Sequence, residues 1–115
     1  MPDEDLTQLT VAQLGPRIQS GEISPLEVAE AFLRRIDVLE PRLNAFITRV
    51  DEHALQAARE AEAEILRGGY RGPFHGIPVG LKDLFWTKGV RTTSGSRVTA
   101  DFVPTEDARG VVTPK

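Results

Sequence analysis

Cysteine is missing from this sequence of 115 residues, and histidine is scarce, with only two residues. Without cysteine the chain can form neither a disulfide framework nor a cysteine-based zinc site, and two isolated histidines do not suggest another metal centre. The sequence also lacks an apolar run of about eighteen residues, which a membrane-spanning helix would need. Its first residues are acidic, unlike the basic start of a secretory signal. We therefore expect a cytoplasmic protein that uses no metal and no cofactor.

The chain also has little net charge, because fourteen basic residues stand against seventeen acidic ones, which gives a formal charge of −3. This balance argues against direct binding to nucleic acid or to an anionic membrane. The hydrophobic content of 40% is that of an ordinary globular domain. A single domain of this size buries roughly 60 to 70% of its unfolded surface, so any active site would be shallow or shared.

The first half of the sequence carries the start and stop signals of helices. Thr10 and Gln13 form a capping-box pattern, and the Pro16 that follows predicts a weak or kinked first helix. Ser24 is a suitable N-cap for a second helix with one apolar face, and Glu27 completes a second capping box there; we expect this helix to end before Pro41. A third, alanine-rich segment is closed by two glycines. The expected helices cover about 10–20, 25–39 and 51–67.

Glycine and proline become frequent after residue 67, which favours strands and loops over helices. The best strand candidate is about 77–84, and 85–115 reads as a glycine-rich loop. Alternation along this strand places its apolar residues on one face and Lys82 on the other, beside small residues. An enclosed lysine without a carboxylate partner gives up its proton readily, so Lys82 is a candidate general base. Lysine at a strand end is more often exposed to solvent, and the local pattern alone does not assign catalysis.

Residues 72–83, GPFHGIPVGLKD, closely resemble the lysine-bearing segment of the amidase-signature family. The resemblance extends from residue 10 to about 108 and includes the stretches 20–24, 41–46, 92–96 and 104–108. It implies an α/β fold with a large mixed sheet between helices. Residues 1–115 would supply the N-terminal helices and the first strand of that domain.

The same resemblance implies amide-bond hydrolysis or amide-nitrogen transfer by a Ser-cisSer-Lys triad, in which Lys82 matches the lysine. The two serines of the family lie in a downstream Gly-Ser-Ser-Gly-Gly-Ser type of stretch, which this chain does not contain. Ser94 and Ser96 match a threonine- and glycine-rich loop instead, and with Thr93 and Gly95 they are candidates for lining the substrate pocket. We therefore expect a chain that supplies only the lysine and is inactive alone.

The expected substrate is a small-molecule amide, and the subunits of an amidotransferase are candidate partners. Because the sequence departs from the family pattern after residue 108, we interpret it as an N-terminal piece, truncated, frameshifted or deliberately shortened. Gly110 and Pro114 predict that its last residues form no helix. His75 is expected to shape the turn before the strand rather than to transfer protons.

An alternative interpretation is a noncatalytic helical module. The apolar stripes of the second and third helices would then pair with a partner or with a second copy of the chain. Such a module would be indifferent to replacement of Lys82, whereas the enzyme would not.

Overall fold

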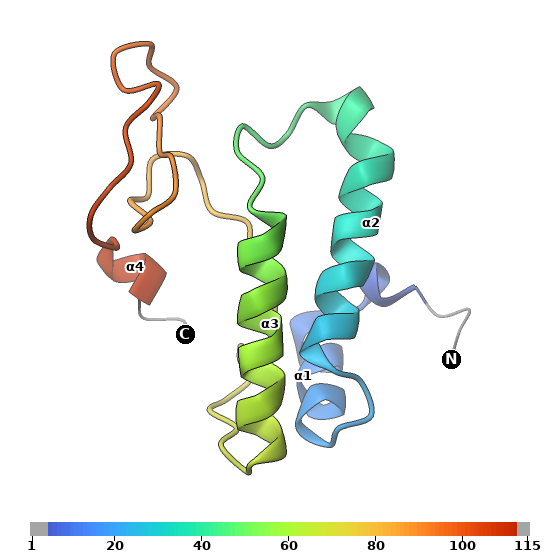
Figure 1. Ribbon diagram of the computed structural model, residues 1–115. Coiled ribbons are helices and arrows are strands. Elements are labelled where there is room, and N and C mark those ends of the chain that lie inside the picture. Colours follow the sequence, from blue (N-terminus) through green and yellow to red (C-terminus); the bar gives the residue numbers. More distant parts are fainter. Residues whose placement is uncertain (1–4, 113–115) are drawn as a thin grey trace. The chain divides into compact units, whose positions relative to one another are not determined.

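The computed structural model describes residues 5–112, which form helices joined by loops (Figure 1). They divide into two compact units: one contains the chain up to Phe46 together with Asp51–Pro78, and the other contains Ile47–Val50 and the chain from Val79 onward. The helices are η1 (Leu6–Gln8, a 3-10 turn), α1 (Val11–Gln19), α2 (Pro25–Leu43), α3 (Asp51–Leu66) and α4 (Arg109–Val112). All but α4 belong to the first unit.

The capping boxes predicted at the starts of α1 and α2 are confirmed. Thr10 Oγ1 accepts from the Gln13 N–H at 3.1 Å, and the Gln13 side chain accepts from the Thr10 N–H at 2.8 Å. Ser24 Oγ accepts from the Glu27 N–H at 3.0 Å, and Glu27 Oε1 accepts from the Ser24 N–H at 3.3 Å. Each box satisfies backbone donors that a helix start leaves free, and a cap of this kind stabilises a helix by about 1 kcal/mol.

Helix α1 is continuous from Val11 to Gln19 although Pro16 lies inside it. Proline cannot donate to the carbonyl four residues earlier, so the helix forgoes one hydrogen bond at Ala12. The capping box and the burial of Leu14 and Ile18 on the opposite side offset that loss. The helix therefore persists where its local pattern predicts a weak one.

Helix α2 continues through Pro41 to Leu43, beyond the end at residue 39 that the sequence suggested. Glu40 explains the extension. Its backbone carbonyl accepts from the Asn44 N–H at 2.8 Å, and its carboxylate accepts from the N–H groups of Ala45 and Phe46 at 2.8 and 2.9 Å. Asn44 closes the helix in the left-handed conformation, with φ of 47°. The end of the helix is stabilised by a residue before the proline, so the proline does not end it.

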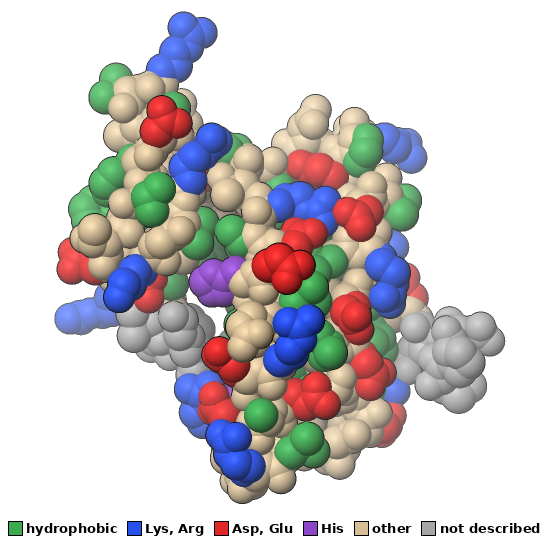
Figure 2. Space-filling model, viewed as in Figure 1, with side chains coloured by type: hydrophobic (Ala, Val, Ile, Leu, Met, Phe, Trp, Pro, Cys, Tyr) green, Lys and Arg blue, Asp and Glu red, His purple; other side chains and the backbone are tan. Residues whose placement is uncertain are grey.

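The first unit is organised around α2, which packs beside α3 (Figure 1). Ala58 and Ala61 are buried on α3, and these short side chains allow the two helices to approach closely. Figure 2 shows acidic and basic side chains interspersed over the outer face of these helices. The core of the unit is formed by Leu14, Ile18, Ile23 and Val28, with Leu6, Leu9, Phe32, Ile65 and Ile77 packed against it.

The strand expected over 77–84 does not form. The β pairing within residues 5–112 is one isolated bridge between Thr87 and Val90. Ile77 packs against the core of the first unit, whereas Val79 and Leu81 are 62% and 46% exposed. A strand requires a neighbouring strand to accept its backbone hydrogen bonds, and residues 5–112 offer none at this segment. The apolar side chains that alternate over 77–81 therefore do not line the face of a sheet here.

The segment expected as a glycine-rich loop over 85–115 contains one helical turn, α4 (Arg109–Val112). The Val111 N–H donates to the Ala108 carbonyl at 2.9 Å, and Val111 is buried, which stabilises this turn despite Gly110. Residues 113–115, including Pro114, lie outside the described part of the chain. Over the described residues, no helix is long and apolar enough to cross a membrane.

Candidate active site

Lys82 lies at the start of a turn in the second unit. Its backbone carbonyl accepts hydrogen bonds from the N–H groups of Leu84 and Phe85, at 2.8 and 3.1 Å. Its side chain is exposed to solvent, so the enclosure expected for this lysine is absent from the structure. The strand expected here does not form, so no sheet covers the Lys82 side chain.

The neighbouring Asp83 connects this turn to the threonine-rich loop. One carboxylate oxygen accepts from the Thr93 N–H at 2.9 Å, and the other accepts a short hydrogen bond from the Thr93 hydroxyl. The Asp83 backbone carbonyl accepts from the Ser94 N–H at 2.7 Å. The structure thus brings the predicted pocket residues against the residue that follows Lys82 in the chain.

The four residues predicted to bind substrate have different surroundings. Thr93 is 5% exposed, and its hydroxyl oxygen accepts from the Gly95 N–H at 3.1 Å while donating to Asp83. Ser94, Gly95 and Ser96 are exposed, and Ser94 and Gly95 both adopt the left-handed conformation, with φ of 53° and 69°. Thr93 therefore anchors the loop, whereas the next three residues face solvent.

Asp83 was not identified as a site residue from the sequence. The hydrogen bond from the Thr93 hydroxyl, followed by the one from its amide, holds the pKa of the Asp83 carboxyl below its ordinary value of 3.8. Asp83 is therefore a carboxylate at neutral pH. No local pattern signals this contact, because the aspartate turns visible in a sequence join residues about two positions apart, whereas Asp83 and Thr93 are ten positions apart.

A second set of contacts fastens the rest of this unit. The rings of Trp86 and Phe102 pack edge to face with centroids 5.3 Å apart. The Trp86 carbonyl accepts from the Ala108 N–H at 2.8 Å, and the Thr92 N–H donates to the Phe102 carbonyl at 2.9 Å. The segment that follows the Lys82 turn is thus tied, through Trp86 and Thr92, to residues 102–108. No three acidic or histidine side chains within residues 5–112 lie close enough together to hold a metal ion.

His75 belongs to the first unit and is a structural residue. It is 5% exposed, its Nδ1 accepts from the Arg71 N–H at 3.0 Å, and its ring stacks on Tyr70. Its Nε2 lies 3.6 Å from a carboxylate oxygen of Glu64. Because Nδ1 is an acceptor, protonation of that nitrogen would break the bond from Arg71. Burial, and then the Arg71 charge, lower the pKa of His75, while Glu64 opposes them.

A pH dependence of stability follows from His75. Below about pH 6.5 the unfolded histidine takes up a proton that the folded one resists, so the free energy of unfolding falls as the pH decreases through this range. One such group contributes a slope of at most about 1.4 kcal/mol per pH unit. We expect the free energy of unfolding, measured with urea between pH 7.5 and 5, to fall as the pH decreases in the unsubstituted protein. The fall should be smaller in His75→Gln. The exposed His53 provides the control, and His53→Gln should keep the parent slope. Equal slopes in the parent and His75→Gln would contradict the prediction.

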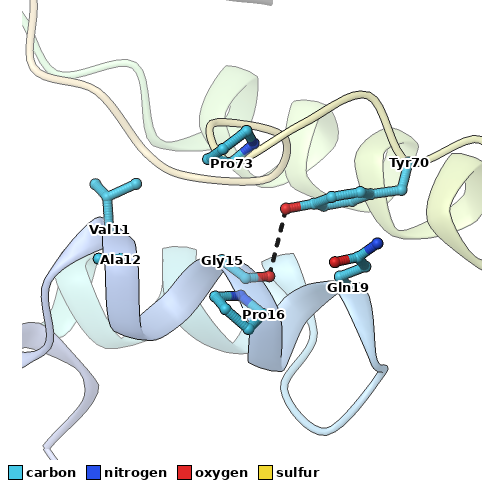
Figure 3. A pocket seen from close by; sticks show the side chains of 7 residues that line it. All are labelled: Val11, Ala12, Gly15, Pro16, Gln19, Tyr70 and Pro73. Carbon is cyan, nitrogen blue, oxygen red and sulfur yellow. Dashed lines mark hydrogen bonds between the residues drawn. The ribbon is translucent and has the colours of Figure 1, made fainter.

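The first unit also contains a shallow groove between α1 and the segment around Tyr70 (Figure 3). The Tyr70 hydroxyl donates to the Gly15 carbonyl at 3.5 Å across it. The groove is lined by Val11, Ala12, Gly15, Pro16, Gln19, Tyr70 and Pro73. None of these side chains carries a charge at neutral pH, and the chemistry is expected around Lys82.

Comparison with known proteins places this chain in a family. The sequence model of the family described as Amidase matches residues 27–113. The chain is 44% identical over 107 residues to a protein of Geotalea daltonii that is named as one of the subunits of glutamyl-tRNA(Gln) amidotransferase, covering 93% of this chain and 22% of the relative. It is 40% identical over 107 residues to AmiD of Mycobacterium tuberculosis, which carries an amidase name, covering 92% of this chain and 22% of the relative.

A solved structure gives the same result. It comes from work on a vestigial protein complex and the evolutionary origins of an s-triazine catabolic enzyme. It matches 87% of this chain with a TM-score of 0.81 at 30% identity, and the chain covers 22% of it. The chain thus spans about a fifth of the length of the relatives it matches. On the family match and these identities, the chain belongs to the amidase family.

Proposed function

We propose that this chain supplies the lysine-bearing part of an amidase-family active site that hydrolyses an amide bond or transfers its nitrogen. The supporting observation is that Lys82 stands in the segment resembling the family's lysine motif, inside the matched range 27–113. In the proposed Ser-cisSer-Lys mechanism, the unprotonated amine accepts a proton through a bridging serine. A second serine attacks the carbonyl and forms an acyl-enzyme as the amide C–N bond breaks, and the amine leaves with a proton that the lysine returns through the bridging serine.

The surroundings of Lys82 are consistent with a site that other parts of an enzyme complete. Lys82 is exposed, and large apolar side chains around it are exposed as well, at Val79, Leu81, Leu84, Phe85 and Trp86. Figure 2 shows hydrophobic side chains at the surface of this unit. In the proposed complete enzyme, an α/β domain with a mixed sheet covers these side chains and withdraws the amine from water. A lysine withdrawn from water gives up its proton more readily.

The loop 93–96 is the proposed contact with substrate. Ser94, Gly95 and Ser96 are exposed and follow Thr93, and the hydroxyl groups of Ser94 and Ser96 can donate to a carboxamide. The relatives whose name places them in a glutamyl-tRNA(Gln) amidotransferase support partner subunits for the complete protein. The relative with an amidase name supports a simple amide as substrate.

The test is to complete the chain. We define the completed chain as residues 1–115 joined to the part of the Geotalea daltonii relative that lies beyond the match. The completed chain is expected to release amine from a simple aryl amide, and the 115-residue chain is not. Activity in the 115-residue chain that survives Lys82→Ala would refute the role of Lys82. A completed chain that unfolds cooperatively and yet releases no amine would contradict the proposal as a whole.

The interaction-module alternative is distinguished by association. Val38 and Leu43 on α2 and Leu66 on α3 are 72%, 64% and 75% exposed, which provides apolar surface for a partner. Sedimentation of the 115-residue chain at several concentrations separates the two interpretations. A stable monomer that unfolds cooperatively favours a self-sufficient module, whereas an aggregating or molten chain favours the part of an enzyme.

A further inference from the structure

Asp83 holds the loop 93–96 with both its side chain and its backbone. The carboxylate accepts from the N–H and the hydroxyl of Thr93, and the Asp83 carbonyl accepts from the Ser94 N–H. Hydrogen bonds to a carboxylate are among the strongest in proteins. A single residue therefore joins two segments ten positions apart.

The other end of this connection is the backbone of Lys82. The Lys82 carbonyl closes the turn by accepting from Leu84 and Phe85, so the residues on both sides of Asp83 are held in place. The amine of a lysine sits on a flexible four-carbon stem. Its position is controlled only if the backbone from which the stem leaves is itself fixed.

The Thr93 end is fixed independently. Thr93 is buried, its carbonyl accepts from the Thr99 hydroxyl, and its own hydroxyl oxygen accepts from the Gly95 N–H. Without the Asp83 carboxylate, the buried N–H and O–H of Thr93 would lose their acceptors, an expensive state for buried donors. The loop would then be expected to move away from the lysine turn.

We propose that Asp83 is the positioning residue of this site, which fastens the loop 93–96 to the turn of Lys82 and thereby fixes both the base and the substrate loop. The inference rests on the proposed function, because it takes Lys82 as the base. It adds a role for a residue that touches neither substrate nor the reacting atoms.

The first experiment is a double-mutant cycle in the completed chain with Asp83→Ala, Thr93→Val and both together. Because a misplacement of about 1 Å can cost about 100-fold in rate, we expect Asp83→Ala to lower kcat by about 10- to 100-fold. KM should rise as well, because the released loop 93–96 is the proposed contact with substrate, but the positioning role requires that kcat falls. If Asp83 acts through Thr93, the double variant should be no slower than Asp83→Ala. Asp83→Asn keeps an acceptor for the Thr93 N–H and should fall between the parent and Asp83→Ala.

Two further readouts separate positioning from simple loss of folded protein. Amide exchange over 91–99 in the completed chain should be about tenfold faster in Asp83→Ala. The pH profile of kcat should change shape, since a displaced base meets different surroundings, whereas a smaller folded fraction lowers the rate equally at every pH. Asp101→Asn, which removes an exposed carboxylate from the same unit, is the matched control and should change none of these.

The outcomes identify which proposal fails. If Lys82→Ala abolishes activity while Asp83→Ala keeps the parent kcat and exchange rates, the positioning role is wrong and the proposed function stands. Additive losses in the double variant would also overturn the positioning role. If activity survives Lys82→Ala, the proposed function fails whatever Asp83 does. Should Asp83→Ala not fold, kcat and KM are measured separately in Asp83→Asn and Thr93→Val. A raised KM with unchanged kcat in these variants overturns the inference.

Discussion

Lys82→Ala in the completed chain is expected to lower kcat by about 100- to 10,000-fold, the range in which a general base contributes to catalysis. The loss should be of similar size in kcat and in kcat/KM, because the amine acts in the transition state rather than in holding the substrate. The measurement is steady-state release of amine from an aryl amide. Circular dichroism should show that the variant remains folded, because the Lys82 side chain is exposed and its backbone makes the hydrogen bonds of the turn.

Two control variants distinguish a role of Lys82 in proton transfer from a role of its positive charge. Lys82→Arg keeps the positive charge but removes the base, because a guanidinium stays protonated, and we expect it to lose as much activity as Lys82→Ala. Lys88→Ala removes another exposed lysine from the same unit and should keep the parent rate. Activity close to the parent level in Lys82→Arg would show that the site uses the charge and not the base.

Gly76→Ala is expected to lower the free energy of unfolding by about 2 to 5 kcal/mol. Gly76 has φ of +84°, and a Cβ placed there would lie 2.7 Å from Cγ of Pro25 and 3.1 Å from its Cβ. The left-handed backbone costs a non-glycine residue about 1 to 2 kcal/mol. Overpacking against a rigid neighbour typically costs about 1 to 3 kcal/mol more, because the proline ring at the start of α2 cannot move aside. Urea unfolding of the completed chain with and without the substitution measures the loss.

Gly21→Ala is the matched control for this substitution. Gly21 has φ of +83°, yet nothing lies within 4 Å of the Cβ that alanine would add. Its loss should therefore reflect the backbone alone, at about 1 to 2 kcal/mol. The difference between the two variants isolates the contact with Pro25. Equal losses would show that the ring accommodates the added methyl group and that the packing argument is wrong.

The starts of the helices could be predicted from the sequence because their determinants are local. Thr10 with Gln13 and Ser24 with Glu27 are pairs within one turn, and each pair makes its hydrogen bonds as predicted. The end of α2 could not be predicted in the same way. It depends on Glu40 reaching amides up to six residues ahead, which offsets the effect of Pro41.

The site was only partly predictable for a similar reason. The motif around Lys82 and the loop 93–96 are visible in the sequence, but the connection between them depends on Asp83 and Thr93 meeting across ten residues. The strand over 77–84 was expected because apolar residues alternate with other residues there, a pattern that indicates which side chains could face a sheet. Alternation does not say whether neighbouring strands are present, and residues 5–112 contain none for this segment.

The unpaired segment at 78–81 affects how the chain behaves at high concentration. Over 78–81 the backbone lies outside any helix or sheet, with exposed Val79 and Leu81 on either side of Gly80. Such a stretch is a template on which a second copy could add a strand, and repeated addition leads toward fibrils. Pro78 lacks the N–H that such growth requires, so it acts as a gatekeeper. We expect replacement of Pro78 by a β-branched residue to favour such strand addition.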